Sequence, residues 1–187
     1  MSVLVVDNLS PYTGDILLCL DKLKANYTYK KFYEKADREI STYEGVILSG
    51  RSKPSRDINV ANFNLVLECS LQGTPLLGIC YGAEIMAIAL GGTIRRMLNP
   101  VKEMSKVSLI ESPETDIVFQ TYRSLYVYES HAFCIARMPD DFVSIAASKH
   151  CQKEIIVNLK RKMLGVQFHP EKSRADGLLL FSSFLRM

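Results

Sequence analysis

The sequence predicts an α/β protein with a central mixed, mostly parallel sheet flanked by helices. Two observations carry this prediction. In the first half, short and wholly apolar runs, typical of strands buried on both faces, alternate with helix-like segments. In the second half, short β-rich segments follow one another between turns, which predicts antiparallel strands and hairpins. No repeat or linker divides the 187 residues, so we expect one domain over residues 1–187.

The first half is read from its apolar pattern and its turn residues. Residues 3–6 are a continuous β-branched and Leu run, whereas residues 15–23 carry apolar side chains at helical spacing. A polar segment with Pro54 predicts a loop over 49–57, and Gly91-Gly92 closes the third helix. The predicted strands are 3–6, 27–32, 45–48 and 75–79, and the predicted helices are 15–23, 61–69 and 83–90.

The second half contains seven further predicted strands and one helix. The basic cluster at 160–162 is expected to be a solvated hairpin turn, and residues 175–185 form an amphipathic pattern that predicts a closing helix. The predicted strands are 93–96, 106–110, 117–120, 125–129, 143–146, 154–158 and 164–168.

Composition and charge exclude several classes of protein. The 23 basic and 20 acidic residues give a net charge of +3, too balanced for a surface that binds nucleic acid or an anionic membrane. No apolar run approaches the ~18 residues that span a bilayer, and the opening residues lack the basic region of a signal peptide. The five scattered cysteines include no CxxC pair, which argues against a disulfide framework or a zinc site. We therefore expect a cytoplasmic, reduced protein.

The most informative stretch runs from a predicted buried strand through Gly78-Ile79-Cys80-Tyr81-Gly82 into a predicted helix. This is the arrangement of a nucleophile elbow, with Cys in the place where hydrolases have Ser. The flanking glycines allow a tight turn and a close approach of neighbouring backbone. The N–H groups at the start of the helix point toward the sulfur and favour its thiolate form. Cys80 is the predicted nucleophile.

A second motif, Phe168-His169-Pro170-Glu171, follows the last predicted strand. An imidazole and a carboxylate two positions apart can act as a base and the group that orients it. His169 would accept the thiol proton, and Glu171 would fix the tautomer of His169 and support its cation. With only three histidines in the chain, this motif is informative.

Together the two motifs resemble those of the class I glutamine amidotransferase family, and the resemblance extends over nearly the whole chain. The family's Gly-x-Cys-x-Gly elbow matches residues 78–82, and its Phe-His-Pro-Glu matches residues 168–171. The resemblance implies a flavodoxin-like fold and the hydrolysis of glutamine through a glutamyl thioester on Cys80. It further implies that His169 protonates the departing ammonia and then activates water. The implied oxyanion hole consists of the backbone N–H of Tyr81 and one from the loop at Gly50 and Arg51.

Two positions depart from the family pattern. Where the family has Ser-Gly-Gly-Pro, this chain has Ser49-Gly50-Arg51-Ser52, and Arg51 does not freely adopt a positive φ. We expect this oxyanion donor to need substrate or a partner to bring it into place. Where relatives have Gly-His-Gln, this chain has Gly82-Ala83-Glu84. Glu84 can accept the substrate's α-ammonium but repels its α-carboxylate, so weaker binding or an altered substrate is expected.

The remaining features most resemble the separate amidotransferase subunit of archaeal GMP synthase. Tyr128-Glu129-Ser130-His131 is similar to a segment that lies near the active site and the partner-facing surface of that subunit. The resemblance implies roles in substrate binding for Gly82, Ser130 and His131, with a purely structural role for His131 equally open. It implies no metal or organic cofactor in this chain. ATP and Mg²⁺ are expected on a separate ammonia-accepting synthetase subunit of the ATP-pyrophosphatase type.

Three alternatives stay open. Asp7-Asn8 with Tyr12-Thr13 is similar to the opening of the small subunit of anthranilate or aminodeoxychorismate synthase. A stand-alone γ-glutamyl hydrolase is more distant. The departures at Arg51 and Glu84 also allow a catalytically weak binding or regulatory module on the same scaffold, against which the intact Cys80, His169 and Glu171 argue.

Overall fold

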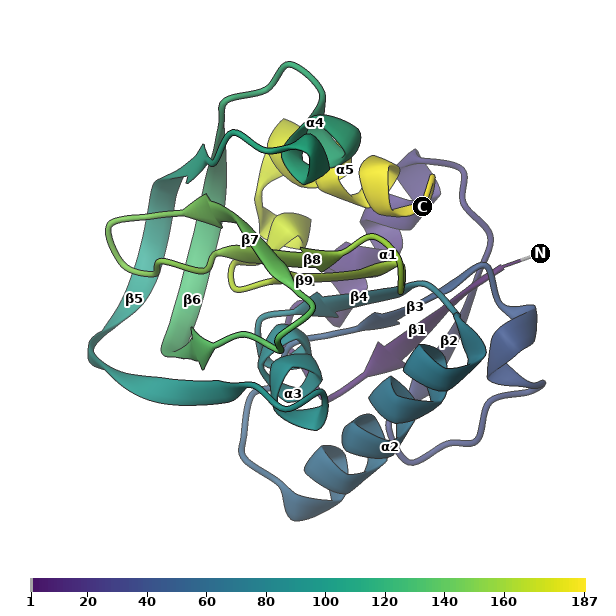
Figure 1. Cartoon of the computed structure of the whole chain (residues 1–187). Coiled ribbons are helices and arrows are strands. Elements are labelled where there is room, and N and C mark those ends of the chain that lie inside the picture. Colours follow the sequence, from purple (N-terminus) through teal and green to yellow (C-terminus); the bar gives the residue numbers. More distant parts are fainter. Residues whose placement is uncertain (1) are drawn as a thin grey trace.

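A nine-stranded mixed sheet runs through residues 2–187, the part of the chain that the computed structural model describes (Figure 1). The strand order is β2-β1-β3-β4-β9-β8-β7-β5-β6. The parallel strands are β2 (Tyr27–Lys31), β1 (Val3–Asp7), β3 (Gly45–Leu48), β4 (Leu76–Ile79) and β9 (Met163–Val166). The antiparallel strands are β8 (Ile155–Asn158), β7 (Val143–Ala147), β5 (Thr93–Leu109) and β6 (Ser124–Arg137). The mixed sheet predicted from the sequence is confirmed.

Helices cover both faces of the parallel half because successive side chains of a strand point to opposite faces. Val3 and Val5 pack with α1 (Thr13–Lys22) and α5 (Arg174–Phe184). Leu4 and Val6 belong to the opposite cluster, which contains side chains of α2 (Arg56–Gln72) and α3 (Tyr81–Ala89). Full burial stabilises the fold by roughly 1.5–3 kcal/mol for each large aliphatic side chain. Across residues 2–187, no helix combines the length and apolarity needed to cross a membrane.

Strands β5 and β6 form a long antiparallel ribbon at one edge of the sheet (Figure 1). The sequence predicts two strands at 93–96 and 106–110, but β5 is one strand of 17 residues with a register shift between Arg96 and Val101. The polar segment between the two apolar runs stays extended because β6 supplies its hydrogen-bond partners. For the same reason β6 is longer than the predicted 125–129.

One predicted strand is wrong: residues 117–120 lie largely in the helix α4 (Pro113–Phe119). The side chain of Ser112 caps this helix by accepting from the Thr115 N–H at 3.1 Å, and Pro113 occupies the first turn. These are ordinary helix-start signals that outweigh the β-branched pair at 117–118. Capping likewise explains why α2 begins at Arg56, before the predicted 61, because Ser55 accepts from the Ile58 N–H at 3.4 Å.

Candidate active site

The turn between β4 and α3 holds Cys80 in a backbone conformation that non-glycine residues rarely adopt, with φ 50° and ψ −105°. The flanking glycines make room for this turn. A Cβ on Gly78 would lie 2.5 Å from the carbonyl oxygen of Gly82, and a Cβ on Gly82 would lie 2.5 Å from that of Leu48. The Cys80 N–H donates to the Val166 carbonyl at 2.7 Å, which ties the turn to β9. The strand–Cys–helix elbow expected from the sequence is present.

His169 and Glu171 follow the end of β9 and are both buried. The Nδ1 atom of His169 lies 2.7 Å from Oε1 of Glu171, which leaves Nε2 free to face another group. Burial lowers the pKa of His169, but the negative charge of Glu171 and the neighbouring Cys80 outweigh this effect. The pKa of His169 is therefore well above its ordinary value of 6.5. The site favours an imidazolium at this position.

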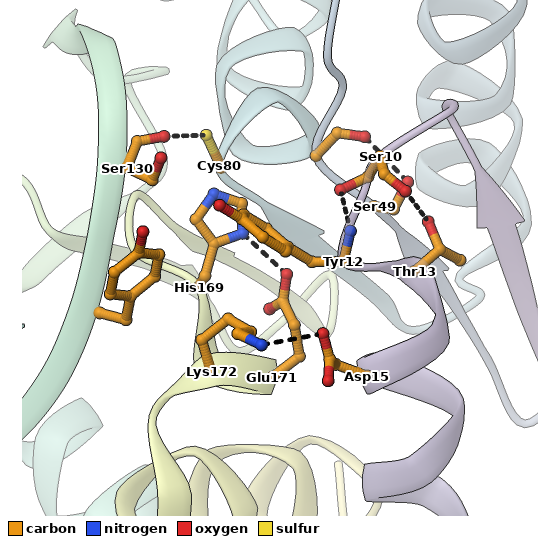
Figure 2. A network of polar contacts seen from close by, with 12 residues as sticks. Ser10, Tyr12, Thr13, Asp15, Ser49, Cys80, Ser130, His169, Glu171 and Lys172 are labelled. Atoms are coloured by element: carbon orange, nitrogen blue, oxygen red, sulfur yellow. Dashed lines mark hydrogen bonds and ion pairs between the residues drawn. The ribbon is translucent and has the colours of Figure 1, made fainter. Parts of the chain in front are cut away.

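The ends of three neighbouring parallel strands bring these groups together, as open α/β sheets commonly do. Figure 2 shows the Cys80 sulfur close to the His169 ring, with Glu171 on the other side of the ring. Gly50, directly after Ser49 at the end of β3, lies against both residues: a Cβ there would be 3.1 Å from His169 Cε1 and 3.8 Å from Cys80 Cβ. Only a residue without a side chain fits this place comfortably.

Cys80 and His169 line a pocket of about 460 Å³. Its charged side chains include Arg51, Lys53 and Glu84, and its wall includes the segment from Ser130 to Phe133. Burial raises the pKa of Glu84, which His131 and Arg51 partly offset. A pocket of this size with charges of both signs suits a small zwitterion.

Two of the predicted substrate-binding residues have a different placement. Gly82 is absent from the pocket lining in the described part of the chain, and its close contact with Leu48 gives it a packing role between α3 and β3. His131 lines the pocket, but both ring nitrogens are engaged elsewhere: Nδ1 lies 2.8 Å from the Phe133 carbonyl and Nε2 lies 3.1 Å from Glu129. Ser130 does face the site, since its carbonyl oxygen lies 3.9 Å from Cys80 Sγ.

Arg51 closes one side of the pocket with its side chain. Its guanidinium lies 4.0 Å from the centre of the Tyr81 ring and donates to Asn59 Oδ1 at 2.6 Å, and the Tyr81 hydroxyl donates to the same oxygen at 3.0 Å. The backbone of Arg51 is not among the described residues with positive φ. Tyr81 is the first residue of α3, so its N–H has no intrahelical acceptor and is available to a ligand.

Tyr12 lies in the site although no signal in the sequence indicated a role for it there. Asp7 accepts from the Ser10 N–H and the Thr13 hydroxyl, which fixes the loop after β1. This loop places the Tyr12 ring edge-on to His169, at 4.9 Å between ring centres (Figure 2). The residue pattern of the loop was visible in the sequence, but the contact between Tyr12 and His169 depends on tertiary structure.

Comparison with known proteins agrees with this geometry. The family model described as Glutamine amidotransferase class-I matches residues 4–187. A separate subunit of the glutamine-hydrolyzing GMP synthase of Saccharolobus solfataricus is 30% identical over 152 residues, which are 81% of this chain and 80% of that protein. The glutamine-hydrolyzing GMP synthase of Caldanaerobacter subterraneus is 31% identical over 163 residues, which are 82% of this chain but 30% of that longer protein.

Solved structures give the same result. A protein from Thermoplasma acidophilum described as a GMP synthase subunit superposes with a TM-score of 0.84 at 26% identity, covering 100% of this chain and 92% of that one. The glutaminase domain of Trypanosoma brucei CTPS has a TM-score of 0.76 at 15% identity, covering 100% of this chain and 94% of that one, which shows a shared fold alone. The chain belongs to the class I glutamine amidotransferase family and has its flavodoxin-like fold.

Proposed function

We propose that this chain hydrolyses the side-chain amide of glutamine at Cys80 and passes the ammonia to a separate synthetase subunit, that of GMP synthase. The observation that carries the reaction is the strained Cys80 beside a buried His169–Glu171 pair with an Nδ1–Oε1 distance of 2.7 Å. The similarity to the GMP synthase subunit of Saccharolobus solfataricus supports the choice of acceptor.

In the first half of the reaction the Cys80 sulfur attacks the amide carbon of glutamine. The C–S bond forms, and the carbonyl oxygen gains negative charge that the N–H of Tyr81 and a backbone N–H at Gly50 or Arg51 stabilise. His169 then gives its proton to the amide nitrogen, the C–N bond breaks, and ammonia leaves. The product is a glutamyl thioester on Cys80.

In the second half water resolves the thioester. Neutral His169 accepts a proton from water as the oxygen attacks the thioester carbon. The C–S bond breaks, glutamate leaves, and the thiolate–imidazolium pair is restored. Glu171 holds His169 in the tautomer that keeps Nε2 toward the sulfur during both halves.

The charges around the pocket suit the amino-acid end of glutamine. Glu84 supplies a carboxylate for the α-ammonium, and the Arg51 guanidinium supplies a cation for the α-carboxylate. Arg51 thereby offsets the repulsion that Glu84 alone would exert on the α-carboxylate. Its stacking on Tyr81 and its bond to Asn59 hold the guanidinium in place before substrate binds.

The hydrolysis needs no organic cofactor, since sulfur, imidazole and water supply every atom and proton that moves. ATP and Mg²⁺ belong to the partner, which must activate the acceptor before ammonia can displace a leaving group. The partner of this chain is then the ATP-pyrophosphatase subunit of GMP synthase.

The test measures glutamate and ammonia release from glutamine by the chain alone and with that partner and its nucleotide substrates. Cys80→Ala is compared with Cys69→Ala, which removes a buried thiol from α2, away from the pocket. We expect Cys80-dependent release that rises when the partner is present. Release that needs Cys80 but ignores the partner rejects the GMP synthase assignment, and no release from the folded chain under any condition rejects the glutaminase.

A further inference from the structure

A second group of ionisable side chains lies behind the wall of the pocket. Glu129 and His131 lie on β6, and Glu154 directly precedes β8. Glu129 and Glu154 are fully buried, and His131 is 6% exposed. One ligand atom from each of the three residues lies within 4.8 Å of the others. The proposed glutaminase reaction assigns no step to this group.

The alternation of β6 makes the position of Glu129 unusual. Leu125 and Val127 point into the core, and Glu129 and His131 take the next two inward positions. A buried carboxylate is costly unless charges and hydrogen bonds compensate for it. Two such carboxylates near one another imply that something positive belongs between them.

The carboxylates lack enough protein donors. Oε2 of Glu129 lies 3.1 Å from His131 Nε2, and Oε1 of Glu154 accepts from the Ser148 hydroxyl at 2.6 Å. The other oxygens, Oε1 of Glu129 and Oε2 of Glu154, are buried and have no hydrogen-bond partner within residues 2–187. The cluster therefore presents unused acceptor atoms in a closed space.

The surroundings orient these atoms as the neighbours of metal ligands do. The Nδ1 atom of His131 lies 2.8 Å from the Phe133 carbonyl, so Nδ1–H donates there and the lone pair of Nε2 points toward the carboxylates. The Ser148 hydroxyl fixes Glu154 in the same way. Ligating histidines in proteins almost always donate their second ring N–H to such an acceptor, and ligating carboxylates are themselves hydrogen-bonded.

We propose that Glu129, His131 and Glu154 bind one divalent transition-metal ion, with Zn²⁺ as the first candidate. Two carboxylates balance the charge of the ion, and an imidazole ligand selects zinc and its neighbours over Mg²⁺ or Ca²⁺. The ion would link β6 to the segment before β8. It would also fix the pocket wall at His131 and Ser130. This site departs from the expectation of a metal-free chain and does not depend on the proposed reaction.

The experiment uses the full chain with Cys80→Ala, because Cys80 and His169 together could also bind zinc. The protein is stripped with a chelator, loaded with Zn²⁺ or Co²⁺, dialysed, and analysed for metal content and for the cobalt absorption spectrum. We expect one equivalent of metal and a cobalt spectrum of nitrogen and oxygen ligands without a thiolate charge-transfer band.

Substitutions assign the ligands. Glu129→Gln and Glu154→Gln should each weaken metal binding by at least about tenfold, since loss of even an outer partner has an effect of that size. Glu103→Gln is the matched control, because Glu103 is partly exposed and contacts His150 Nε2 at 2.9 Å outside the cluster. It should leave metal binding unchanged. Circular dichroism checks that each variant is folded.

Three results would overturn the proposal: no metal retained by the Cys80→Ala chain, equal retention in the two glutamine variants, or a thiolate band from Cys134 or Cys151. If neither variant folds, the Cys80→Ala chain decides. A higher melting temperature with Zn²⁺ and a nitrogen–oxygen cobalt spectrum support the site. An unchanged melting temperature without bound metal means that protons alone neutralise the carboxylates.

Discussion

The N–H of His169 donates to the carbonyl of Tyr128 at 2.8 Å, joining the residue after β9 to the middle of β6. Ser173 reinforces this link: its hydroxyl donates to the His169 carbonyl at 2.6 Å and accepts from the Tyr128 N–H at 3.0 Å. The antiparallel ribbon therefore holds the proposed catalytic base, whereas the parallel half of the sheet holds the proposed nucleophile.

Replacing Ser173 tests this link. Ser173→Ala removes both side-chain bonds from a buried site, so the free energy of unfolding should fall by about 1–3 kcal/mol. Because His169 loses a positioning contact, kcat should fall more than KM rises. Urea unfolding and steady-state glutaminase assays measure both effects. Ser182→Ala, at a partly exposed position on α5, is the control. Equal kcat values in the two variants would show that Ser173 does not position the base.

The elements with strong local signals were predictable from the sequence, and those set by tertiary contacts were not. The buried strands at 3–6, 45–48 and 75–79 were predictable because apolar runs of that length have few other solutions. The length of the β5–β6 ribbon was not, because each strand is extended only where the other pairs with it. The helix at 113–119 was predictable from Ser112 and Pro113, but the β-branched pair was given more weight.

The same division holds for the site. The positions of Cys80, His169 and Glu171 followed from two motifs, and the structure brings all three to one place (Figure 2). The stacking of Arg51 on Tyr81 could not be predicted, because it depends on how the loop after β3 meets the first turn of α3. Nor could the burial of Glu154, which is far from Glu129 in sequence and close to it in space.

Glu171 sets the titration of His169. In Glu171→Gln an amide oxygen still accepts from Nδ1 but the negative charge is gone, so the pKa of His169 should fall. We expect kcat to drop by about 10²–10⁴-fold, in line with the loss of an orienting carboxylate elsewhere. The pH dependence of kcat/KM should shift toward lower pH. An unshifted profile would contradict the role of Glu171.

The same variant should change the dependence of stability on pH. A histidine whose pKa is higher in the folded than in the unfolded state contributes stability that is fully present below about 6.5 and is lost as pH rises through the folded pKa. The difference in unfolding free energy between the parent chain and Glu171→Gln should therefore shrink as pH rises through this window. Urea unfolding at several pH values measures it, and a difference that grows with pH would contradict the assignment.

The close approach of α3 to β3 can be tested with two glycines. Gly82→Ala places a Cβ 2.5 Å from a backbone oxygen of Leu48, so α3 must shift, and we expect a loss of about 1–3 kcal/mol of stability and reduced activity. Gly14→Ala in α1 meets nothing within 4 Å and should stabilise by roughly 0.5–1 kcal/mol. Thermal unfolding compares them. Equal melting temperatures would mean that the elbow tolerates a side chain at 82.

Glu84 distinguishes two modes of substrate binding. If its carboxylate accepts the α-ammonium of glutamine, Glu84→Gln should raise KM by about 10–100-fold with little change in kcat, the loss of one charge-assisted hydrogen bond. If it chiefly repels the α-carboxylate, the same variant should lower KM. Initial rates over a range of glutamine concentrations separate the two, and we expect the rise.

The most direct test of the proposed chemistry is covalent labelling of the folded chain with a glutamine analogue that carries an electrophilic carbon at the amide position. Peptide mass spectrometry then locates the adduct among the five cysteines. We predict one adduct, on Cys80, that forms about 10²-fold or more slowly in His169→Ala and is suppressed by excess glutamine. No adduct on the folded chain, or labelling of Cys19, Cys69, Cys134 or Cys151 in preference to Cys80, would contradict the assignment of Cys80 as the nucleophile.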